Sequence, residues 1–249
     1  MGLEEAIVLG ALQGILEWLP ISSQGQVTWV MLNVFGHTPA QALSESIFLH
    51  IGTLLAATVY FRKDVARIIT GKENQTRMFL AAALAGTAIT GAISYLILRE
   101  ILGAPLLFTL VIGISLIITG IVQQKRRLRF GGKMTPKNGF FVGLAQGFSI
   151  IPGVSRSGTS TSALLFEGFK LKDAFRLSFI LSIPTIAVAE AFFALEGGII
   201  VGTEQLVALG VAAIVGFLSI GILLNLVEKL DFSKFCIGLG LIYLGIALL

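Results

Sequence analysis

Charged residues are scarce in this chain. Asp, Glu, Lys and Arg make up 13% of its 249 residues, against about 25% in an ordinary soluble domain. Hydrophobic residues make up 55%, and the mean hydropathy is +0.91. A soluble globule cannot bury this much apolar surface. The composition therefore excludes a disordered chain, a nucleic-acid-binding domain and an ordinary cytosolic enzyme, and leaves a polytopic helical membrane protein.

Cysteine and the common soluble catalytic motifs are also nearly absent. The single cysteine, Cys236, lies in an apolar stretch, so it can form no intrachain disulfide and we expect it to pack as a small buried residue. There is no paired Cys or His metal motif, no Walker loop and no Gly-x-Ser-x-Gly elbow. The start of the chain is acidic at Glu4 and Glu5, whereas a signal peptide starts basic, so we expect no cleaved leader.

Six apolar stretches are suited to crossing a membrane, which takes about 20 mostly apolar residues in a helix. Three of them carry no charge over that length, namely 78–98, 104–124 and 205–227. Three more contain a polar residue or fall short, namely 46–61, 177–195 and 235–249. We predict an all-α polytopic membrane protein with six transmembrane helices.

Two further apolar regions, 3–38 and 138–168, are each broken in the middle. The breaks are rich in Gly, Ser and polar residues and lie around Pro20 and Pro152. Each half is too short to cross the bilayer. Irregular backbone persists at membrane depth only where protein buries it or where it lines a wet cavity. We therefore predict two re-entrant helical hairpins.

The positions of the basic residues support this layout. Four stretches, 62–77, 125–137, 170–176 and 229–234, hold every Lys and Arg except Arg99 and Arg156. With six spans and two non-crossing hairpins, all four stretches fall on one face, as the positive-inside rule expects of the cytoplasmic face. Both termini then lie outside the cytoplasm. The net charge of +4 needs no nucleic-acid partner.

The two broken regions also match each other in sequence. Identical residues recur at one offset of 133: Gln13 and Gln146, Gly14 and Gly147, Ser22 and Ser155, Gly25 and Gly158. Each hairpin is followed by three spans, an odd number, so the second copy is upside down relative to the first. We predict one membrane domain over 1–249, built as an inverted-topology repeat of about 1–124 and 138–249. In such repeats the breaks meet near the midplane and form a site.

Arg156 is the strongest functional candidate. An ionisable group inside an apolar segment is costly and marks a functional site, and the planar guanidinium suits phosphate. Hydroxyls and an open backbone surround it, from Ser155, Ser157, Gly158, Thr159 and Ser160. A half-helix that begins after this turn adds N–H donors and a positive dipole end. This group predicts a phosphate or diphosphate site; the alternative is a structural ion pair with a buried carboxylate.

Glu17 is the expected partner of that site. Gln13 precedes it by one helical turn and faces the same way, and Ser22, Ser23 and Gln26 follow in the same break. The carboxylate could hold a divalent cation beside a phosphate or act as a general acid or base. It could equally form a structural ion pair with the arginine, and spacing does not separate these readings.

Other polar residues in the spans are expected to be structural. His50 lies one turn from Thr53, and we expect hydrogen-bonded packing there rather than catalysis. Glu45 and Glu190 lie near span ends, where their carboxylates can reach water. We expect Asn225 to hydrogen-bond between helices.

Two segments resemble the signatures of a known family. Residues 13–23, QGILEWLPISS, and residues 152–158, PGVSRSG, are similar to the two signatures of the undecaprenyl-diphosphatase family. Residues 49–54, 60–62 and 230–232 are similar too, so the resemblance covers essentially the whole chain. It implies hydrolysis of a polyprenyl diphosphate, undecaprenyl or dolichyl, to the monophosphate and inorganic phosphate, which recycles a glycan carrier lipid.

The resemblance also implies roles for individual residues. Gln13 and Glu17 match the acidic pair of the family, Ser23 a serine discussed as the nucleophile, and Arg156 the phosphate-binding arginine. A divalent cation, Mg²⁺ or Ca²⁺, is implied at Glu17. The implied site opens to the extracytoplasmic side of the plasma membrane.

One departure from the family pattern affects the chemistry. Gln26 stands where the family usually has a histidine implicated in catalysis, and glutamine cannot shuttle a proton. Either Ser23 or a metal-activated water attacks with Glu17 as base, or the chain is a non-hydrolytic transporter of polyprenyl phosphate that uses the same anion site. The sequence does not fix the oligomeric state, and a homodimer is one of the states that it allows.

Overall fold

The structure is a computed structural model that describes residues 1–101, 105–124, 131–197, 201–227 and 229–248. These residues form helices and irregular segments without a strand. In chain order the elements are α1 (Leu3–Leu16), α2 (Ser23–Asn33), α3 (Pro39–Phe48), α4 (His50–Tyr60), α5 (Arg62–Ile69), α6 (Asn74–Ile101), α7 (Pro105–Gln124), α8 (Pro136–Gly147), the 3-10 turn η1 (Phe148–Ile150), α9 (Arg156–Phe166), α10 (Leu171–Leu195), α11 (Thr203–Leu226) and α12 (Phe232–Ala247).

Among the described residues, five helical stretches are long and apolar enough to cross a membrane. They are Pro39–Tyr60, Asn74–Leu98, Leu106–Gln124, Leu171–Leu195 and Thr203–Leu226. The sixth predicted span corresponds to α12, which is apolar but only 16 residues long. The prediction of an all-α polytopic membrane protein is confirmed.

The first predicted span starts too late at residue 46. The helical stretch begins at Pro39, because Pro39 suits the first helical position and Thr38 caps the helix. The Thr38 hydroxyl accepts a hydrogen bond from the backbone N–H of Gln41, whose side chain reaches back to Thr38. These polar residues do not register in a hydrophobic run, so the run underestimates the helix.

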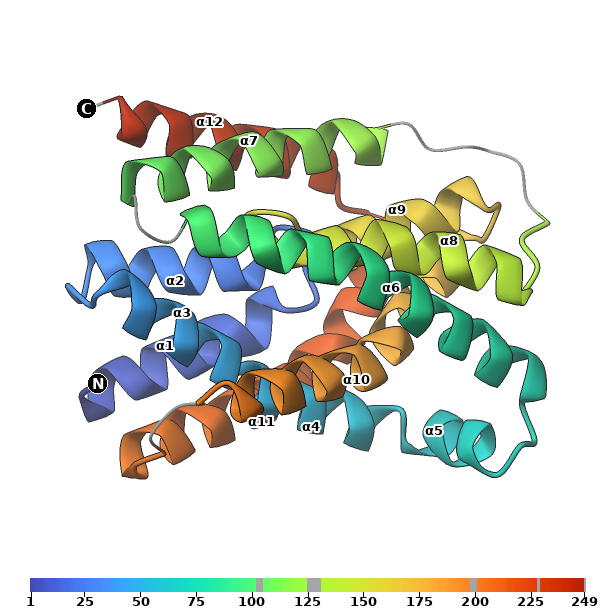
Figure 1. The fold of residues 1–249 in the computed structure, drawn as a ribbon. Helices are drawn as coiled ribbons and strands as arrows, with labels where there is room; N and C mark the ends of the chain where they lie inside the picture. The colour runs from blue at the N-terminus through green and yellow to red at the C-terminus, as the bar shows by residue number, and fades with distance from the viewer. Residues whose placement is uncertain (102–104, 125–130, 198–200, 228, 249) are drawn as a thin grey trace.

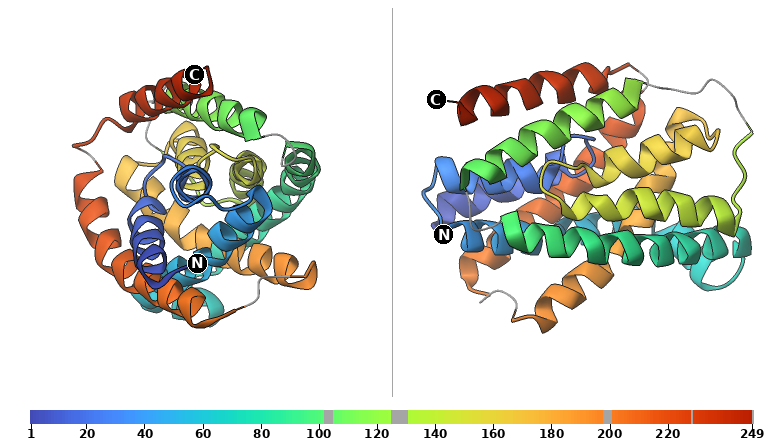
Figure 2. Two further views of the ribbon diagram at one scale, coloured as in Figure 1. Left: turned by 90° about the vertical axis from the view of Figure 1, so that its left-hand side faces the viewer. Right: turned by 45° about the horizontal axis from the view of Figure 1, so that its top comes forward.

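Each broken region is a helix, a break and a second helix, as predicted. The pair α1 and α2 enters from the end of the molecule that carries both termini, and α8 and α9 enter from the opposite end (Figure 1). Both hairpins turn back near the middle, so their breaks meet there (Figures 1 and 2). Basic residues of α5 and of the starts of α6 and α8 lie at the end away from the termini (Figure 1). The two hairpins therefore enter the bundle from opposite ends, and these basic residues lie at the end from which α8 starts (Figure 1).

Glycines let the first helix of each hairpin pack directly against the backbone of a long helix from the other half. The contacting pairs are Gly10–Ala208 and Gly14–Gly216 between α1 and α11, and Gly143–Ala83 and Gly147–Gly91 between α8 and α6. A Cβ atom at any of the four hairpin glycines would collide with backbone. Small residues allow this close approach in membrane helices, where there is little hydrophobic drive for association. The hairpin glycines of the two sets, Gly10 and Gly143, and Gly14 and Gly147, lie at the same offset of 133 as the other repeated residues.

Candidate active site

A cavity of about 670 Å³ lies where the two hairpin breaks meet. One end is polar and includes Glu17, Ser23, His50 and Arg156. The remaining walls come mainly from α6 and α10 and are largely apolar. The cavity therefore has a small polar part and a larger apolar part.

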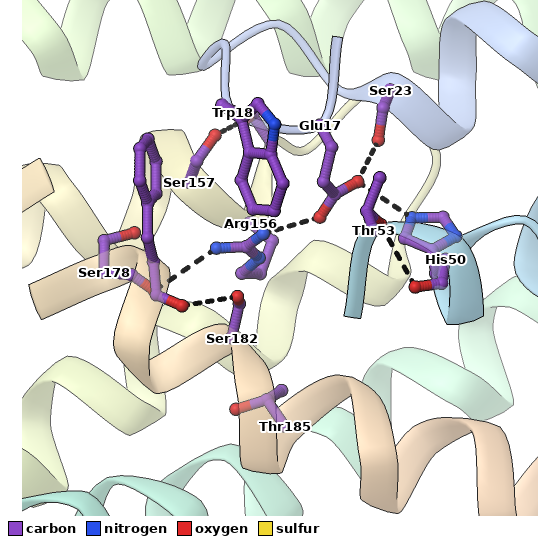
Figure 3. Close-up of polar contacts among 12 residues, drawn as sticks. Glu17, Trp18, Ser23, His50, Thr53, Arg156, Ser157, Ser178, Ser182 and Thr185 are labelled. Carbon is purple, nitrogen blue, oxygen red and sulfur yellow. Dashed lines mark hydrogen bonds and ion pairs between the residues drawn. The ribbon is translucent and has the colours of Figure 1, made fainter. Parts of the chain in front are cut away.

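Arg156 and Glu17 form an ion pair across the two breaks. Arg156 begins α9, Glu17 follows α1, and Nη2 of the arginine lies 2.5 Å from Oε1 of the glutamate (Figure 3). The two side chains are 11% and 4% exposed, respectively. Nη1 donates to the Ser178 carbonyl at 3.3 Å, whereas the buried Nε has no hydrogen-bond partner among the described residues. A charged group with a spare buried donor is suited to receive an anion.

The other carboxylate oxygen of Glu17 is surrounded by three groups. Ser23 donates its hydroxyl proton to Oε2 at 2.6 Å, and Gln13 donates from Nε2 at 2.9 Å. Nε2 of His50 lies 3.3 Å from the same oxygen. Gln13 is fully buried and does not line the cavity, so it holds Glu17 from behind instead of touching a ligand.

Trp18 fixes the position of Glu17 from the next residue. Its indole Nε1 donates to the Gly216 carbonyl at 3.1 Å, and its ring centroid lies 5.2 Å from that of Phe179. The side chain is fully buried in the largest apolar cluster. This anchor ties the first break to α10 and α11, so the carboxylate is held on a rigid support.

Two helices present their N-termini at the breaks. Ser22 caps α2 and Ser155 caps α9, and their hydroxyls accept from the backbone N–H groups of Gly25 and Gly158 at 3.3 and 3.1 Å. Helix N-termini carry a partial positive charge and bind phosphate readily. Within the described part of the chain, Ser22 is the one non-glycine residue with positive φ, at 62°. Such strain gathers at functional sites, and Ser22, Ser23 and Gln24 at the start of α2 all line the cavity.

The predicted hydroxyl residues of the second break divide into those that line the cavity and those that do not. Ser155 and Ser157 line the cavity, and Ser157 also donates to the Leu19 carbonyl at 2.9 Å. Thr159 and Ser160 are not among the lining residues, and their hydroxyls donate to carbonyls of their own helix turn. Gly158 is likewise outside the cavity lining and serves the cap of α9.

Gln26 was predicted to bind substrate, but it turns away from the cavity. Its Oε1 accepts from the Tyr243 hydroxyl at 2.7 Å, and its Nε2 donates to the Ile21 carbonyl at 3.2 Å. These bonds link the first break to α12. The side chain has no contact with Glu17 or with Arg156 among its hydrogen bonds.

His50 and Glu190 are site residues that the sequence analysis did not select. His50 begins α4 beside the first break, and Glu190 projects from α10 into the same cavity. Glu190 interacts electrostatically with both His50 and Glu17. The available signal was that each is an ionisable residue within a predicted span; which spans meet is a property of the fold.

The apolar part of the cavity is a groove between α6 and α10. Its walls include Leu84, Ala88, Ala92, Leu96, Ile186, Ala189, Phe192 and Phe193. Tyr95 packs on Phe192 and Phe193 with centroid distances of 5.3 and 5.9 Å and donates to Glu196. Leu96 and Phe192 are exposed, so the groove reaches the surface of the helix bundle.

The donor set gives little support to a resident cation. Within the described ranges, no three His, Cys, Asp or Glu side chains gather as a metal-binding group. Both oxygens of Glu17 are already engaged by Arg156, Ser23 and Gln13. These residues do not fit a divalent cation held by the protein alone.

The fold is that of a polytopic helical membrane protein, and its cavity holds a buried Arg156–Glu17 ion pair between two broken hairpins. The chain belongs to the family described as "Bacitracin resistance protein BacA", whose sequence profile matches residues 6–242. A relative named undecaprenyl-diphosphatase from Methanococcoides burtonii is 42% identical, covering 97% of both chains. Proteins of the same name from Methanothrix thermoacetophila and Haloarcula marismortui are 40% and 39% identical, covering 98% and 95% of this chain and 97% and 95% of their own.

Proposed function

We propose that this protein hydrolyses a polyprenyl diphosphate, of undecaprenyl or dolichyl type, to the polyprenyl monophosphate and inorganic phosphate. Such a reaction recycles the lipid that carries glycans for the cell envelope. The observation that carries the proposal is that Glu17 accepts a hydrogen bond from the Ser23 hydroxyl on one carboxylate oxygen and pairs with Arg156 through the other. The names of the relatives point to the same reaction.

The polar end of the cavity would bind the diphosphate. Arg156 supplies a fixed positive charge and a spare Nε–H donor, and the N-termini of α2 and α9 add oriented backbone dipoles. Ser155 and Ser157 lie on the same wall. When an anion enters, part of the guanidinium turns to phosphate oxygen and its hold on Glu17 weakens. The carboxylate then becomes a better proton acceptor.

Ser23 is the favoured nucleophile because its hydroxyl already donates to Glu17 at 2.6 Å. Glu17 takes the hydroxyl proton, Oγ bonds to the terminal phosphorus, and the bond from phosphorus to the bridging oxygen breaks. Water then hydrolyses the phosphoserine and restores the hydroxyl. In the second route, Glu17 takes a proton from a water that attacks directly. In both routes Arg156 stabilises the charge that develops on the phosphoryl oxygens.

The prenyl chain would lie in the apolar groove between α6 and α10. The groove continues from the polar end and reaches the lipid-facing surface through exposed apolar side chains such as Leu96 and Phe192. A long isoprenoid can stay partly in the bilayer while its head group enters the site.

We further propose that the site opens to the extracytoplasmic side of the plasma membrane. Tyr95 and Leu96 of the groove lie toward the end of α6 that is near the termini, and the basic residues gather at the other end (Figure 1). The positive-inside rule assigns that basic end to the cytoplasm. Addition of an impermeant thiol reagent to intact cells carrying Leu3→Cys or Lys72→Cys in a Cys236→Ala background tests this, with labelling expected only at position 3.

The transport alternative has no support from the relatives, which are named for a diphosphatase activity. A transporter would also have no need for the serine–carboxylate hydrogen bond.

The proposal is tested by phosphate release. Purified protein in detergent is given undecaprenyl or dolichyl diphosphate, and inorganic phosphate is measured for the natural chain, for Arg156→Ala and for Arg67→Ala. Arg67 pairs with Glu73 on the surface and serves as the matched control. We expect release by the natural chain and by Arg67→Ala and none by Arg156→Ala; no release by the folded natural chain contradicts the proposal.

A further inference from the structure

We propose that His50 is a catalytic residue of this site. It shares a proton with Glu17 and delivers that proton to the departing polyprenyl monophosphate. The inference rests on the proposed function. It assigns the transfer of a proton to the leaving group to His50 on α4. Gln26, in the first break, cannot perform this transfer.

The hydrogen bonds of the His50 ring fix where its protons must be. Nδ1 lies 2.8 Å from the Ser46 carbonyl oxygen and 3.1 Å from that of Ile47. A carbonyl only accepts, so Nδ1 carries a hydrogen. In a neutral ring Nε2 would then be a bare acceptor, yet it faces Oε2 of Glu17 at 3.3 Å. A proton on Nε2 would turn this contact into an ion pair with the carboxylate, and we infer that the pair holds one such proton.

The shared oxygen connects this proton to the nucleophile. Ser23 donates to Oε2 of Glu17, and His50 faces that same oxygen (Figure 3). A proton taken from Ser23 therefore arrives next to the imidazole. Because His50 also lines the cavity, its Nε2 can reach a bound ligand as well as the carboxylate.

The charged groups around His50 are few. Glu17 lies against it from the first break, Glu190 on α10 interacts with it electrostatically, and Arg156 pairs with Glu17. On the opposite side α4 packs on α11 through Gly52, and α11 carries no ionisable residue after Glu204. A further carboxylate lies on α3, which also packs on α4: Glu45, whose buried Oε2 has no hydrogen-bond partner among the described residues.

The proton balance closes with this assignment. Ser23 gives its proton to Glu17 as Oγ bonds to phosphorus, and His50 gives the proton on Nε2 to the bridging oxygen as its bond to phosphorus breaks. Glu17 then passes its proton to His50, which restores the pair. In the second half, water gives a proton to Glu17 and its oxygen to phosphorus, and the Ser23 hydroxyl is reprotonated from His50. The same balance holds if water attacks directly.

Gln26 cannot take this part. Its amide oxygen is held by Tyr243 and its nitrogen by the Ile21 carbonyl. A glutamine also has no titratable proton to give. The catalytic proton therefore has to come from another element, and His50 is the histidine that meets Glu17.

The test compares His50→Gln with His37→Gln, a change at the only other histidine of the chain. His37 also faces a glutamate, Glu5, at 3.4 Å, but it does not line the cavity. We expect His50→Gln to lower kcat by roughly 10²–10⁴-fold, the usual contribution of a general acid or base, with KM and the thermal midpoint unchanged. His37→Gln should keep the natural kcat.

Two further measurements separate a catalytic role from a structural one. The pH profile of kcat should differ between the natural chain and His50→Gln, because the variant has no ionisable group at position 50. His50→Ala opens a hole in the cavity wall, so added imidazole should restore part of its activity and none of that of Arg156→Ala.

The outcomes keep this inference apart from the proposed function. If the natural chain releases phosphate, Arg156→Ala does not, and His50→Gln retains kcat within about threefold with an unchanged pH profile, the inference is overturned while the phosphatase stands. If the natural chain releases no phosphate from any polyprenyl diphosphate, the proposed function fails and this inference fails with it.

Discussion

Arg156 and Glu17 stand 139 residues apart in the sequence, and their side chains meet at 2.5 Å between the two hairpin breaks. A buried ion pair is weak evidence for a purely stabilising role, because desolvation offsets much of the attraction. Here the arginine also has an unpaired buried Nε, and both side chains line a cavity. We interpret the pair as a binding site in which an incoming anion competes with Glu17 for Arg156.

Arg156→Lys tests whether the planar fork matters. Lysine keeps the charge but cannot bind Glu17 and a phosphate from separate edges of one group. We expect kcat/KM to fall by at least about 10-fold, which corresponds to about 1.4 kcal/mol of transition-state stabilisation, with part of the diphosphate binding retained. Equal kcat/KM for Arg156→Lys and the natural chain would show that only charge is needed.

Ser23→Ala separates the two routes of attack. If Ser23 is the nucleophile, the change removes the reaction and no phosphoserine forms on rapid acid quench. If water attacks, activity falls by roughly 10-fold or less through the lost hydrogen bond to Glu17. Thr159→Ala is the control, because that hydroxyl donates to the backbone of α9 outside the cavity. It should behave as the natural chain in both assays.

The glycine contacts between α8 and α6 predict a specific loss of stability. A Cβ at Gly143 meets the backbone of Ala83, whereas one at Gly210 on α11 meets nothing within 4 Å. We expect Gly143→Ala to destabilise the protein by about 1–3 kcal/mol, measured as a lower thermal midpoint in detergent. Gly210→Ala should leave the midpoint equal or slightly higher, since alanine favours helix. Equal midpoints for the two variants would contradict the close packing of the hairpin.

The apolar groove predicts a dependence on prenyl chain length. Ala92→Phe fills the groove, and Ala85→Phe places the same ring on α6 away from the cavity lining. Ala92→Phe should raise KM for a C55 diphosphate more than for a C15 diphosphate, because only the longer chain needs the full groove. Ala85→Phe should change neither value. A uniform effect of Ala92→Phe on both chains would place the tail elsewhere.

The donor set also makes a prediction about divalent cations. Since Glu17 is engaged on both oxygens and the described residues hold no metal-binding group of three, the ligand-free protein should keep its thermal midpoint when Mg²⁺ or EDTA is added. A shift with Mg²⁺ should require a non-hydrolysable diphosphate, whose oxygens can supply most of the ligands. Stabilisation by Mg²⁺ alone would reveal a protein-held cation.

Much of the architecture could be predicted from the sequence, because membrane burial leaves few choices. Polar breaks around Pro20 and Pro152 cannot lie in a lipid-facing helix, so they predict the hairpins. They also indicate Glu17 and Arg156 as candidate functional residues. The full set of site residues was harder to predict from the sequence. His50 and Glu190 belong to separate helices, and their meeting depends on how α4 and α10 pack beside the break. Gln26 follows Ser23 by less than one helical turn, yet Tyr243 on α12 captures its side chain.

Glu17→Gln gives the most direct test of the account. The change keeps the size of the side chain and allows hydrogen bonds to Ser23 and Gln13, but it removes the base. Phosphate release from a polyprenyl diphosphate should fall by roughly 10²–10⁴-fold, while the variant still binds a non-hydrolysable diphosphate analogue. Near-natural release by a folded Glu17→Gln protein would contradict the central claim that this carboxylate, between Ser23 and Arg156, drives the reaction.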